Sequence, residues 1–236
     1  MVDSLGSGAV AVLRCGTHAL ADCFLWIYRC PAVKRLRRVG VTCWDDSMRL
    51  AAVVAAAAAV VDLLVLGLLH IVSPEVDPVT RPVSEYALGD FRWLATTRTL
   101  AQGVATIALA VALRRERAGA LLLLVVGLMK LAMPLFPVDA LGTPATSAGQ
   151  IHNLLGNLTF FLFPVAALLL LRALARRGSR LAPPIAVVLA IVTVGVLVGN
   201  AVGGFGLAQR AYLVLCALWL LLAALAVLRN RNTGTQ

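Results

Sequence analysis

Six apolar stretches, each long enough to cross a bilayer, constrain what this chain can fold into. A transmembrane α-helix needs ~20 mostly apolar residues in a row. Runs of about that length occur at residues 50–71, 93–113, 119–137, 151–171, 182–204 and 210–228. The composition agrees, because 61% of the 236 residues are hydrophobic and the mean hydropathy is +0.91. The sequence therefore predicts an all-α integral membrane protein with six transmembrane helices.

The basic residues gather on one predicted side of the membrane. Of the 21 Lys and Arg residues, 16 precede the first helix or follow the second, fourth or sixth. These are Arg14, Arg29, Lys34, Arg35, Arg37, Arg38, Arg49, Arg114, Arg115, Arg117, Arg172, Arg176, Arg177, Arg180, Arg229 and Arg231. Because cytoplasmic loops carry an excess of Lys and Arg, we expect a multi-pass protein of the plasma membrane with both termini in the cytoplasm. The alternation also explains the net charge of +10, so we expect no nucleic-acid partner.

Three segments of different character follow from these patterns. Residues 1–48 hold four of the five cysteines and the basic cluster VKRLRRVG, and we expect them to form a cytoplasmic N-terminal segment. Residues 49–228 contain all six apolar runs and are predicted to form the transmembrane domain. Residues 229–236 are predicted to form a short cytoplasmic tail.

Two explanations of the N-terminal segment stay open. Between residues 9 and 28, Arg14, His18 and Asp22 would share one face of a helix, which favours an interfacial amphipathic helix over a transmembrane span. Alternatively, translation starts at Met48, directly before the first apolar run, and residues 1–47 are absent from the natural protein.

Two ionisable residues of opposite sign occur at the same predicted depth in the membrane. Asp62 and Lys130 each lie about twelve residues, roughly 18 Å, from the cytoplasmic end of their helix. A charge inside the hydrocarbon layer is costly unless it has a partner or lines a cavity. We therefore predict an intramembrane ion pair between Asp62 and Lys130.

Other polar residues are concentrated in the predicted outer half of the membrane. They are His70, Arg98, Gln102, His152, Asn153, Asn157, Thr159 and Asn200. The inner half is almost entirely Leu, Val and Ala, so the pattern predicts a polar cavity that opens outward. A simpler interpretation is that Asn and Thr hydrogen-bond between helices and only hold the helices together.

Two prolines within apolar runs predict local interruptions of the helical hydrogen-bond ladder. Pro134 cannot donate a hydrogen bond to the carbonyl of Lys130, and Pro164 cannot donate one to the carbonyl of Phe160. These backbone acceptors are therefore available to other donors.

Two predicted outer connections carry most of the remaining polar residues. In the first, SPEVDPVTRPVSEYALGDFRWL at 73–94, the prolines of residues 73–82 indicate an extended link, and Ser84, Glu85 and Tyr86 are expected to fold over the mouth of the cavity. In the second, FPVDALGTPATSAGQIHNLLGN at 136–157, Gly142 and Pro144 predict a turn. Thr146 or Ser147 is expected to cap the next helix, so Asp139 and His152 would meet at the outer mouth.

These two connections together resemble a family of bacterial and archaeal membrane proteins catalogued as domain of unknown function 998. The stretches that carry the likeness are PVSEYALGDFRWL and FPVDALGTPATSAGQIHNLLGNLTFF. The matching positions are Ser84, Tyr86, Leu88, Gly89, Trp93, Asp139, Gly142, Thr146, Gly149 and His152. The resemblance covers roughly residues 50–228, implies a six-helix prokaryotic membrane protein, and brings no established activity with it.

Transport or binding of a small molecule or ion is the first functional hypothesis. Its site would be an outward-facing polar cavity lined by Ser84, Glu85, Tyr86, Trp93, Arg98, Asp139 and His152. Intramembrane charges and interrupted helices are typical of ion-coupled carriers. Apart from the lipid bilayer and this ligand, the sequence identifies no partner, and it leaves the oligomeric state open.

Two alternatives come from other classes. A structural or partner-binding membrane subunit would need the outer motifs only for packing. A membrane-embedded, metal-assisted hydrolase would use His70, His152 and Asp139 as ligands and Glu85 as general base. Because such zinc enzymes usually carry three histidines or a closely spaced pair, we predict no metal site. Two histidines are also a thin basis for haem, so we predict no cofactor, and the sequence favours a protein without catalytic activity.

Overall fold

The computed structural model describes the backbone of residues 31–202 and 205–229, and the side-chain environment of residues 46–196 and 205–229. Within these ranges the chain is helical and contains no strand, so the all-α prediction is confirmed. The chain divides into two compact units, Met1–Asp46 and Ser47–Gln236. The interfacial helix considered for residues 9–28 lies outside the described residues.

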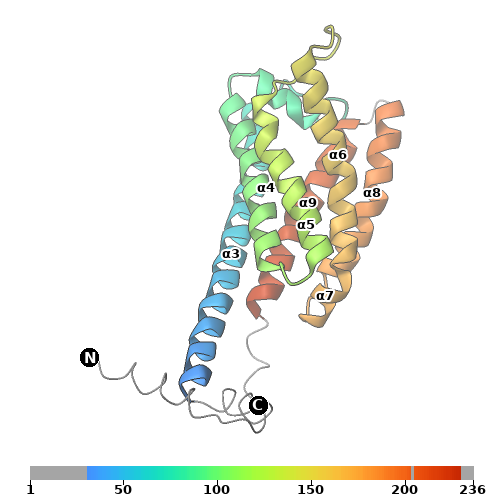
Figure 1. The fold of residues 1–236 in the computed structure, drawn as a ribbon. Coiled ribbons are helices and arrows are strands. Elements are labelled where there is room, and N and C mark those ends of the chain that lie inside the picture. Colours follow the sequence, from blue (N-terminus) through green and yellow to red (C-terminus); the bar gives the residue numbers. More distant parts are fainter. Residues whose placement is uncertain (1–30, 203–204, 230–236) are drawn as a thin grey trace, which may run out of the picture. The chain divides into compact units, whose positions relative to one another are not determined.

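Helix α3 runs from Pro31 to Val72 (Figure 1). It begins 19 residues before the predicted start at residue 50, because the basic stretch preceding the apolar run is helical too. The part from Asp46 to Val72 is long and apolar enough to cross a membrane. The first predicted span is therefore the C-terminal part of a longer helix.

Five helices of the described chain satisfy the length and composition of a membrane span. Besides Asp46–Val72, the spans are Arg92–Ala112, Arg117–Leu135, Ser147–Leu169 and Phe205–Arg229. The fifth predicted span corresponds to helix α8, Ala182–Val202. Its part Ala182–Val196 is apolar but shorter than the five spans. Five of the six predicted spans are therefore candidate membrane spans in the structure.

Helices α4 (Arg92–Ala112) and α5 (Arg117–Ala132) form a closely packed antiparallel pair (Figure 1). A Cβ atom on Gly127 would lie 3.0 Å from the carbonyl oxygen of Gly103. Small residues at such a contact let two helix backbones approach closely, as is common between transmembrane helices. After α5 the chain forms the short 3-10 helix η2, Met133–Leu135, which contains Pro134, so the predicted interruption occurs where the α-helix ends.

The second half of the bundle consists of α6 (Ser147–Leu169), the short α7 (Leu171–Arg176), α8 and α9 (Phe205–Arg229). Helix α6 continues through Pro164 without ending. The hydroxyl of Tyr212 on α9 lies 3.2 Å from the carbonyl oxygen of Thr159 and 3.4 Å from that of Phe160. Because Pro164 has no N–H to donate to the Phe160 carbonyl, Tyr212 offers that acceptor a donor from another helix.

Large apolar side chains cover the outside of the bundle along its length. They include Leu64, Ile71, Leu121, Leu128, Leu154, Phe161, Val165, Leu169, Ile191 and Val194, all of which are exposed. In water such a surface would be unfavourable, whereas in a bilayer it contacts lipid tails. The interior is packed with Ala and Leu together with Trp219, which meets Phe163 edge-to-face at 5.6 Å. The fold is therefore that of a membrane protein.

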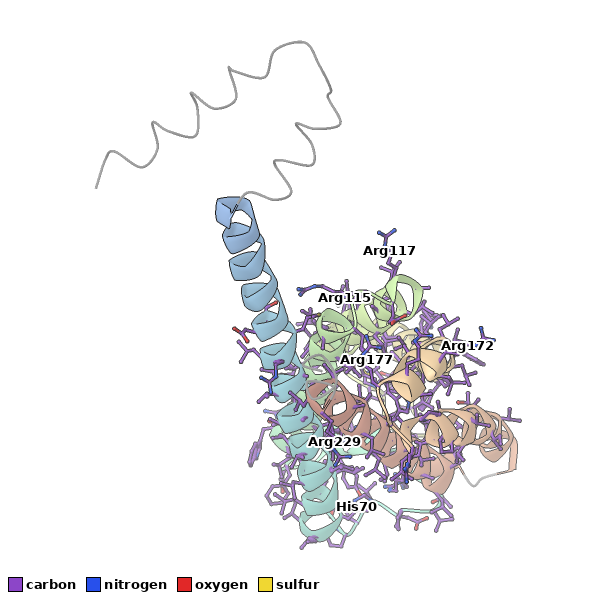
Figure 2. All side chains as sticks on the ribbon, turned by 90° about the horizontal axis from the view of Figure 1, so that it is seen from below. His70, Arg115, Arg117, Arg172, Arg177 and Arg229 are labelled. Carbon is purple, nitrogen blue, oxygen red and sulfur yellow. The ribbon has the colours of Figure 1, made fainter. Side chains whose placement is uncertain are left out.

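Arginines are concentrated at one end of the bundle. This end contains the α4–α5 connection, α7 and the end of α9 (Figures 1 and 2). Within it, Glu116 lies 3.3 Å from Arg177 and 3.6 Å from Arg176, which ties the α4–α5 connection to α7. Arg115, Arg117, Arg172 and Arg229 lie at the same end (Figure 2). The starts of α4, α6 and α9 lie at the opposite end, where the chain forms a cavity.

Candidate functional site

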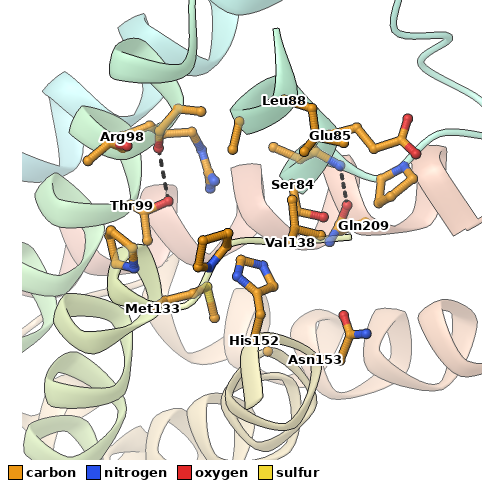
Figure 3. A pocket seen from close by; sticks show the side chains of 18 of the residues that line it. Ser84, Glu85, Leu88, Arg98, Thr99, Met133, Val138, His152, Asn153 and Gln209 are labelled. Atoms are coloured by element: carbon orange, nitrogen blue, oxygen red, sulfur yellow. Dashed lines mark hydrogen bonds between the residues drawn. The ribbon is translucent and has the colours of Figure 1, made fainter. Parts of the chain in front are cut away.

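A cavity of about 1040 Å³ lies at the end of the bundle opposite the arginine-rich end (Figure 3). Its walls come from the 3-10 helix η1 (Val83–Leu88), from α4, α5 and η2, from the 136–141 connection, and from α6 and α9. The polar and charged lining residues are Thr80, Ser84, Glu85, Arg92, Thr96, Thr97, Arg98, Thr99, Lys130, Asp139, His152, Asn153, Asn157 and Gln209. The structure therefore forms a large cavity of mixed polar and apolar lining at this end of the bundle.

Six of the seven predicted site residues line this cavity: Ser84, Glu85, Trp93, Arg98, Asp139 and His152. Ser84 of η1 and His152 of α6 point toward one another across it, with Arg98 of α4 to one side (Figure 3). Tyr86 differs, because it is 1% exposed and is not part of the lining. Its ring packs edge-to-face on His70, with the ring centroids 5.7 Å apart.

Asp139 caps the start of α6. One carboxylate oxygen accepts a hydrogen bond of 2.8 Å from the Thr146 amide and the other accepts one of 2.8 Å from the Thr146 hydroxyl. That hydroxyl in turn accepts a hydrogen bond of 3.0 Å from the Gly149 amide, as an N-cap residue does. Gly149 has no room for a side chain, because the Asp139 carboxylate lies where its Cβ would be. The motif residues Asp139, Thr146 and Gly149 thus form one capping unit.

The turn between Asp139 and Thr146 needs Gly142, whose φ of +83° is one that other residues rarely adopt. His152 joins the same connection to α6, because its Nδ1 atom lies 2.9 Å from the carbonyl oxygen of Phe136. A carbonyl can only accept a hydrogen bond, so Nδ1 carries the proton. The same side chain lines the cavity.

A cluster of buried ionisable residues lies beside the cavity. Asp62 of α3 and Arg98 of α4 form an ion pair with 3.0 Å between Oδ1 and Nε, and both side chains are almost completely buried. The sequence predicted Lys130 as the partner of Asp62. Although Lys130 is also buried, no carboxylate of the described residues forms an ion pair with it. The pair is therefore Asp62–Arg98, because Arg98 is the cation that faces Asp62.

The 3-10 helix η1 is held in place by α9 and by the preceding connection. The Val83 amide donates a hydrogen bond of 2.6 Å to Gln209 Oε1 on α9. Glu85 is buried and pairs with Arg81 at 3.0 Å. Its charge is thus compensated by a neighbour four residues away in sequence.

Arg210 connects more segments than any predicted residue. Its Nε donates a hydrogen bond of 2.8 Å to His70 Nε2, and its Nη1 donates bonds of 2.7 Å and 3.1 Å to the carbonyls of Arg81 and Gly206. Its Nη2 lies 3.3 Å from the Tyr86 hydroxyl, and the guanidinium lies 5.6 Å from the centroid of the Tyr86 ring. One buried cation therefore joins the end of α3, the connection of residues 73–82, η1 and α9.

The connection of residues 73–82, which the sequence indicated to be a simple extended link, packs directly on the start of α9. A Cβ atom on Gly206 would lie 2.5 Å from the Arg81 carbonyl oxygen, so only glycine fits there. The Leu207 amide donates a hydrogen bond of 3.1 Å to the Val79 carbonyl.

Within the connection, Asp77 accepts hydrogen bonds from the Thr80 hydroxyl and from the amides of Val79 and Thr80. These bonds hold the pKa of its carboxyl below the usual range.

Sequence reasoning missed Arg210, Gln209 and Gly206 because it began the last helix at residue 210. The helix begins at Phe205, which places Arg210 in its second turn and buries it. The pair Gln209–Arg210, directly before a long apolar run, was the one available signal.

The weak metal candidates do not come together. In the part of the chain that the structure describes, no three His, Cys, Asp or Glu side chains are grouped as a metal site requires. Both ring nitrogens of His70 are used, since Nδ1 lies 2.6 Å from the Leu66 carbonyl oxygen and Nε2 accepts from Arg210. Asp139 is engaged in capping α6. Binding of a metal or haem by His70 would require breaking these contacts.

Long apolar helices, an exterior rich in exposed Leu, Ile and Val, and buried charged residues between the helices define a helical membrane protein. Within that class the chain belongs to the family described as "Protein of unknown function (DUF998)", whose model matches residues 56–226. This confirms the resemblance drawn from the two outer motifs. No curated protein and no solved structure matches the chain.

Proposed function

We propose that this protein crosses the plasma membrane six times and binds a small molecule or ion in a cavity that faces outward. The arginine-rich end would lie in the cytoplasm, in keeping with the excess of basic residues in cytoplasmic loops (Figure 2). Helix α8 would be the remaining span, because its 21 residues match the thickness of a bilayer and Val187, Ile191 and Val194 are exposed. With six spans, both termini lie on the cytoplasmic side.

The observation that carries the proposal is the cavity itself. Binding pockets of proteins commonly measure ~300–1,000 Å³ and combine apolar walls with a few polar groups. This cavity of about 1040 Å³ has Phe160 and Leu213 beside Arg98, Lys130 and His152. A lining of this kind is typical of a binding site for a small ligand.

A continuation of polar groups below the cavity favours transport as one use of the site. Lys130 lines both the large cavity and a second one of about 10 Å³. The other polar residues of the smaller cavity are Gln102, Thr106, Thr159, Tyr212 and Cys216. A space of this size is about that of one water molecule. Residues with polar side chains therefore continue past Lys130 around this smaller cavity, whose exposed surface is mostly apolar.

Thiol labelling of single-cysteine variants tests whether the cavity opens outward. In a chain whose five native cysteines are replaced by alanine, Ser84→Cys should react with a membrane-impermeant maleimide added to intact cells. Arg172→Cys, at the arginine-rich end, should react only after the cells are permeabilised. Labelling of Arg172→Cys in intact cells, or none of Ser84→Cys, would contradict the proposed orientation and opening.

Filling the cavity tests whether it is used. Gly156 lines the cavity and has room for a side chain, since the nearest atom to its Cβ position is the Met133 methyl at 3.9 Å. Gly67 of α3 faces outward with nothing within 4 Å and gives a matched control. In native mass spectrometry of gently purified protein, the wild type and Gly67→Leu should retain a bound small molecule, and Gly156→Leu should lose it.

A structural subunit is the second candidate, and the contacts of the family motifs favour it. Asp139, Thr146, Gly149 and Tyr86 all make contacts within the protein that hold the outer ends of helices together. If the wild type and both glycine variants retain no small molecule and have equal thermal stability, this alternative is preferred. The metal-assisted hydrolase gains no support from the described residues.

A further inference from the structure

The buried charges beside the cavity do not balance. Asp62, Arg98 and Lys130 are 1%, 5% and 9% exposed, and they comprise one acid and two bases. Asp62 pairs with Arg98 and does not line the cavity, whereas both cations do. The charge that this cluster presents to the cavity is therefore positive.

The other charged lining residues do not offset this excess. Glu85 pairs with Arg81, and Asp139 keeps its negative charge while it accepts two hydrogen bonds from Thr146, the N-cap residue of α6. The remaining charged residue of the lining is Arg92, which is a further cation. Arg92 and Asp139 balance in number and Glu85 is paired with Arg81, so the excess positive charge stays with the buried cluster, where no carboxylate of the described residues forms an ion pair with Lys130.

Arg98 and Lys130 also offer hydrogen-bond donors. Arg98 Nη2 is buried and has no hydrogen-bond partner in the described protein, although Asp62, Glu85 and Gln102 likewise keep buried oxygen atoms without one. Lys130 has three N–H donors and no ion-pair partner among the described residues. His152 and Gln209 also line the cavity and offer further polar groups. Donors of this kind, on Arg and Lys, form their strongest hydrogen bonds with oxyanions.

We propose that Lys130 and Arg98 hold the oxyanion of a phosphate or carboxylate group at the inner part of the cavity. This inference rests on the proposed function, since it names the class of ligand that the same cavity would bind. The apolar walls, including Phe160, Leu213 and Trp93, suit an apolar body attached to that anionic group. Both a lipid headgroup and a free small acid supply the required chemistry, so the experiment separates them.

The test measures how ligands shift the thermal unfolding midpoint of the full chain in a neutral maltoside detergent at constant ionic strength. Inorganic phosphate is the soluble probe, and dioleoyl phosphatidic acid in mixed micelles is the lipid probe, with phosphatidylcholine as the uncharged comparison. Stabilisation by phosphatidic acid alone indicates a lipid headgroup, and stabilisation by inorganic phosphate indicates a free anion. No stabilisation by either probe overturns the proposal.

Variants of two basic residues on α5 assign the effect to the cavity. Lys130→Met removes the buried cation, and Arg117→Met removes an exposed one at the opposite end of the same helix. The apparent affinity for the stabilising probe should fall about tenfold or more in Lys130→Met and stay unchanged in Arg117→Met. Equal binding by wild type and Lys130→Met refutes the role of Lys130.

A measurement that keeps Lys130 covers the case in which Lys130→Met does not fold. The stabilising probe should slow maleimide labelling of Ser84→Cys, because Ser84 lines the same cavity, whereas phosphatidylcholine should not. If Ser84→Cys is labelled from outside but no anion protects it, the cavity remains and the anion assignment fails. If Ser84→Cys is not labelled at all, the proposed function fails first.

Discussion

Asp139 lies directly against the Cα atom of Gly149, so that the carboxylate which caps helix α6 occupies the place of a side chain on that helix. Gly149→Ala should therefore destabilise the protein, because the new methyl group displaces Asp139 from both of its hydrogen bonds to Thr146. Overpacking of this kind costs about 1–3 kcal/mol, and the change is measured as a lower unfolding midpoint in detergent. The control is Gly156→Ala on the same helix, where the nearest atom is 3.9 Å from the Cβ position. Equal midpoints for the two variants would show that Asp139 does not depend on Gly149.

The Gly206 contact predicts a second position at which alanine is harmful. A methyl group there meets the backbone of residues 79–81, which cannot move aside as a flexible side chain could. We expect Gly206→Ala to lower the unfolding midpoint, whereas Gly67→Ala should leave it equal or raise it, since alanine favours helix by about 1 kcal/mol. A Gly206→Ala midpoint at or above that of Gly67→Ala contradicts this packing.

The Asp62–Arg98 pair makes a prediction that distinguishes Arg98 from Lys130. Asp62→Leu leaves buried cations without an acid and should cost about 3–5 kcal/mol of unfolding free energy. Adding Arg98→Met to Asp62→Leu should recover more stability than adding Lys130→Met, because Arg98 is the residue at 3.0 Å. Double-mutant cycles of unfolding measure both couplings. A larger coupling to Lys130 would restore the pairing expected from the sequence.

Tyr212 is predicted to stabilise α6 only because Pro164 lacks an N–H group. Tyr212→Phe removes the hydroxyl near the Thr159 and Phe160 carbonyls and should cost about 0.5–1.5 kcal/mol. In a Pro164→Ala background the restored amide can donate to the Phe160 carbonyl, so the same change should cost less. Unfolding of the four chains gives the comparison, and an identical cost in both backgrounds argues against this exchange of donors.

Arg210 is expected to keep the connection of residues 73–82 and helix η1 ordered. Arg210→Met should increase amide hydrogen exchange in residues 79–86, because the Arg81 carbonyl, the Tyr86 hydroxyl and His70 lose their shared donor. Exchange in residues 139–149 should not change, since the capping unit of α6 does not contact Arg210. Arg92→Met, at an exposed cation of the same end, is the matched control. Unchanged exchange in residues 79–86 would remove Arg210 from this role.

The helices were predictable because a bilayer demands long apolar runs, and such runs are visible in a sequence without knowledge of packing. Depth was predictable for the same reason, which is why Asp62 and Lys130 were expected near one another, whereas Arg98 was assigned only to the outer polar group. The choice between Arg98 and Lys130 depends on how each helix is rotated about its axis. Apolar runs on all faces carry no signal for that rotation.

The outer connections were predictable where local chemistry determines them and unpredictable where tertiary contacts do. The roles of Thr146 as a cap and of Gly142 in a turn follow from short-range rules. The burial of Tyr86 depends on Arg210, which lies 124 residues further along the chain. No local pattern contains that contact, and Tyr86 was therefore expected in the cavity lining when it packs beside His70 instead.

The contacts of Arg210 join η1 and the residues directly before it, which form one wall of the cavity, to helix α9. Widening or closing the mouth at η1 therefore requires either that these hydrogen bonds break or that α9 moves together with the wall. Helix α9 has 25 residues and is about 38 Å long, and its other end carries Arg229 at the arginine-rich face. A tilt of this one helix would therefore move the cavity wall at η1 and the arginine-rich end of the bundle together.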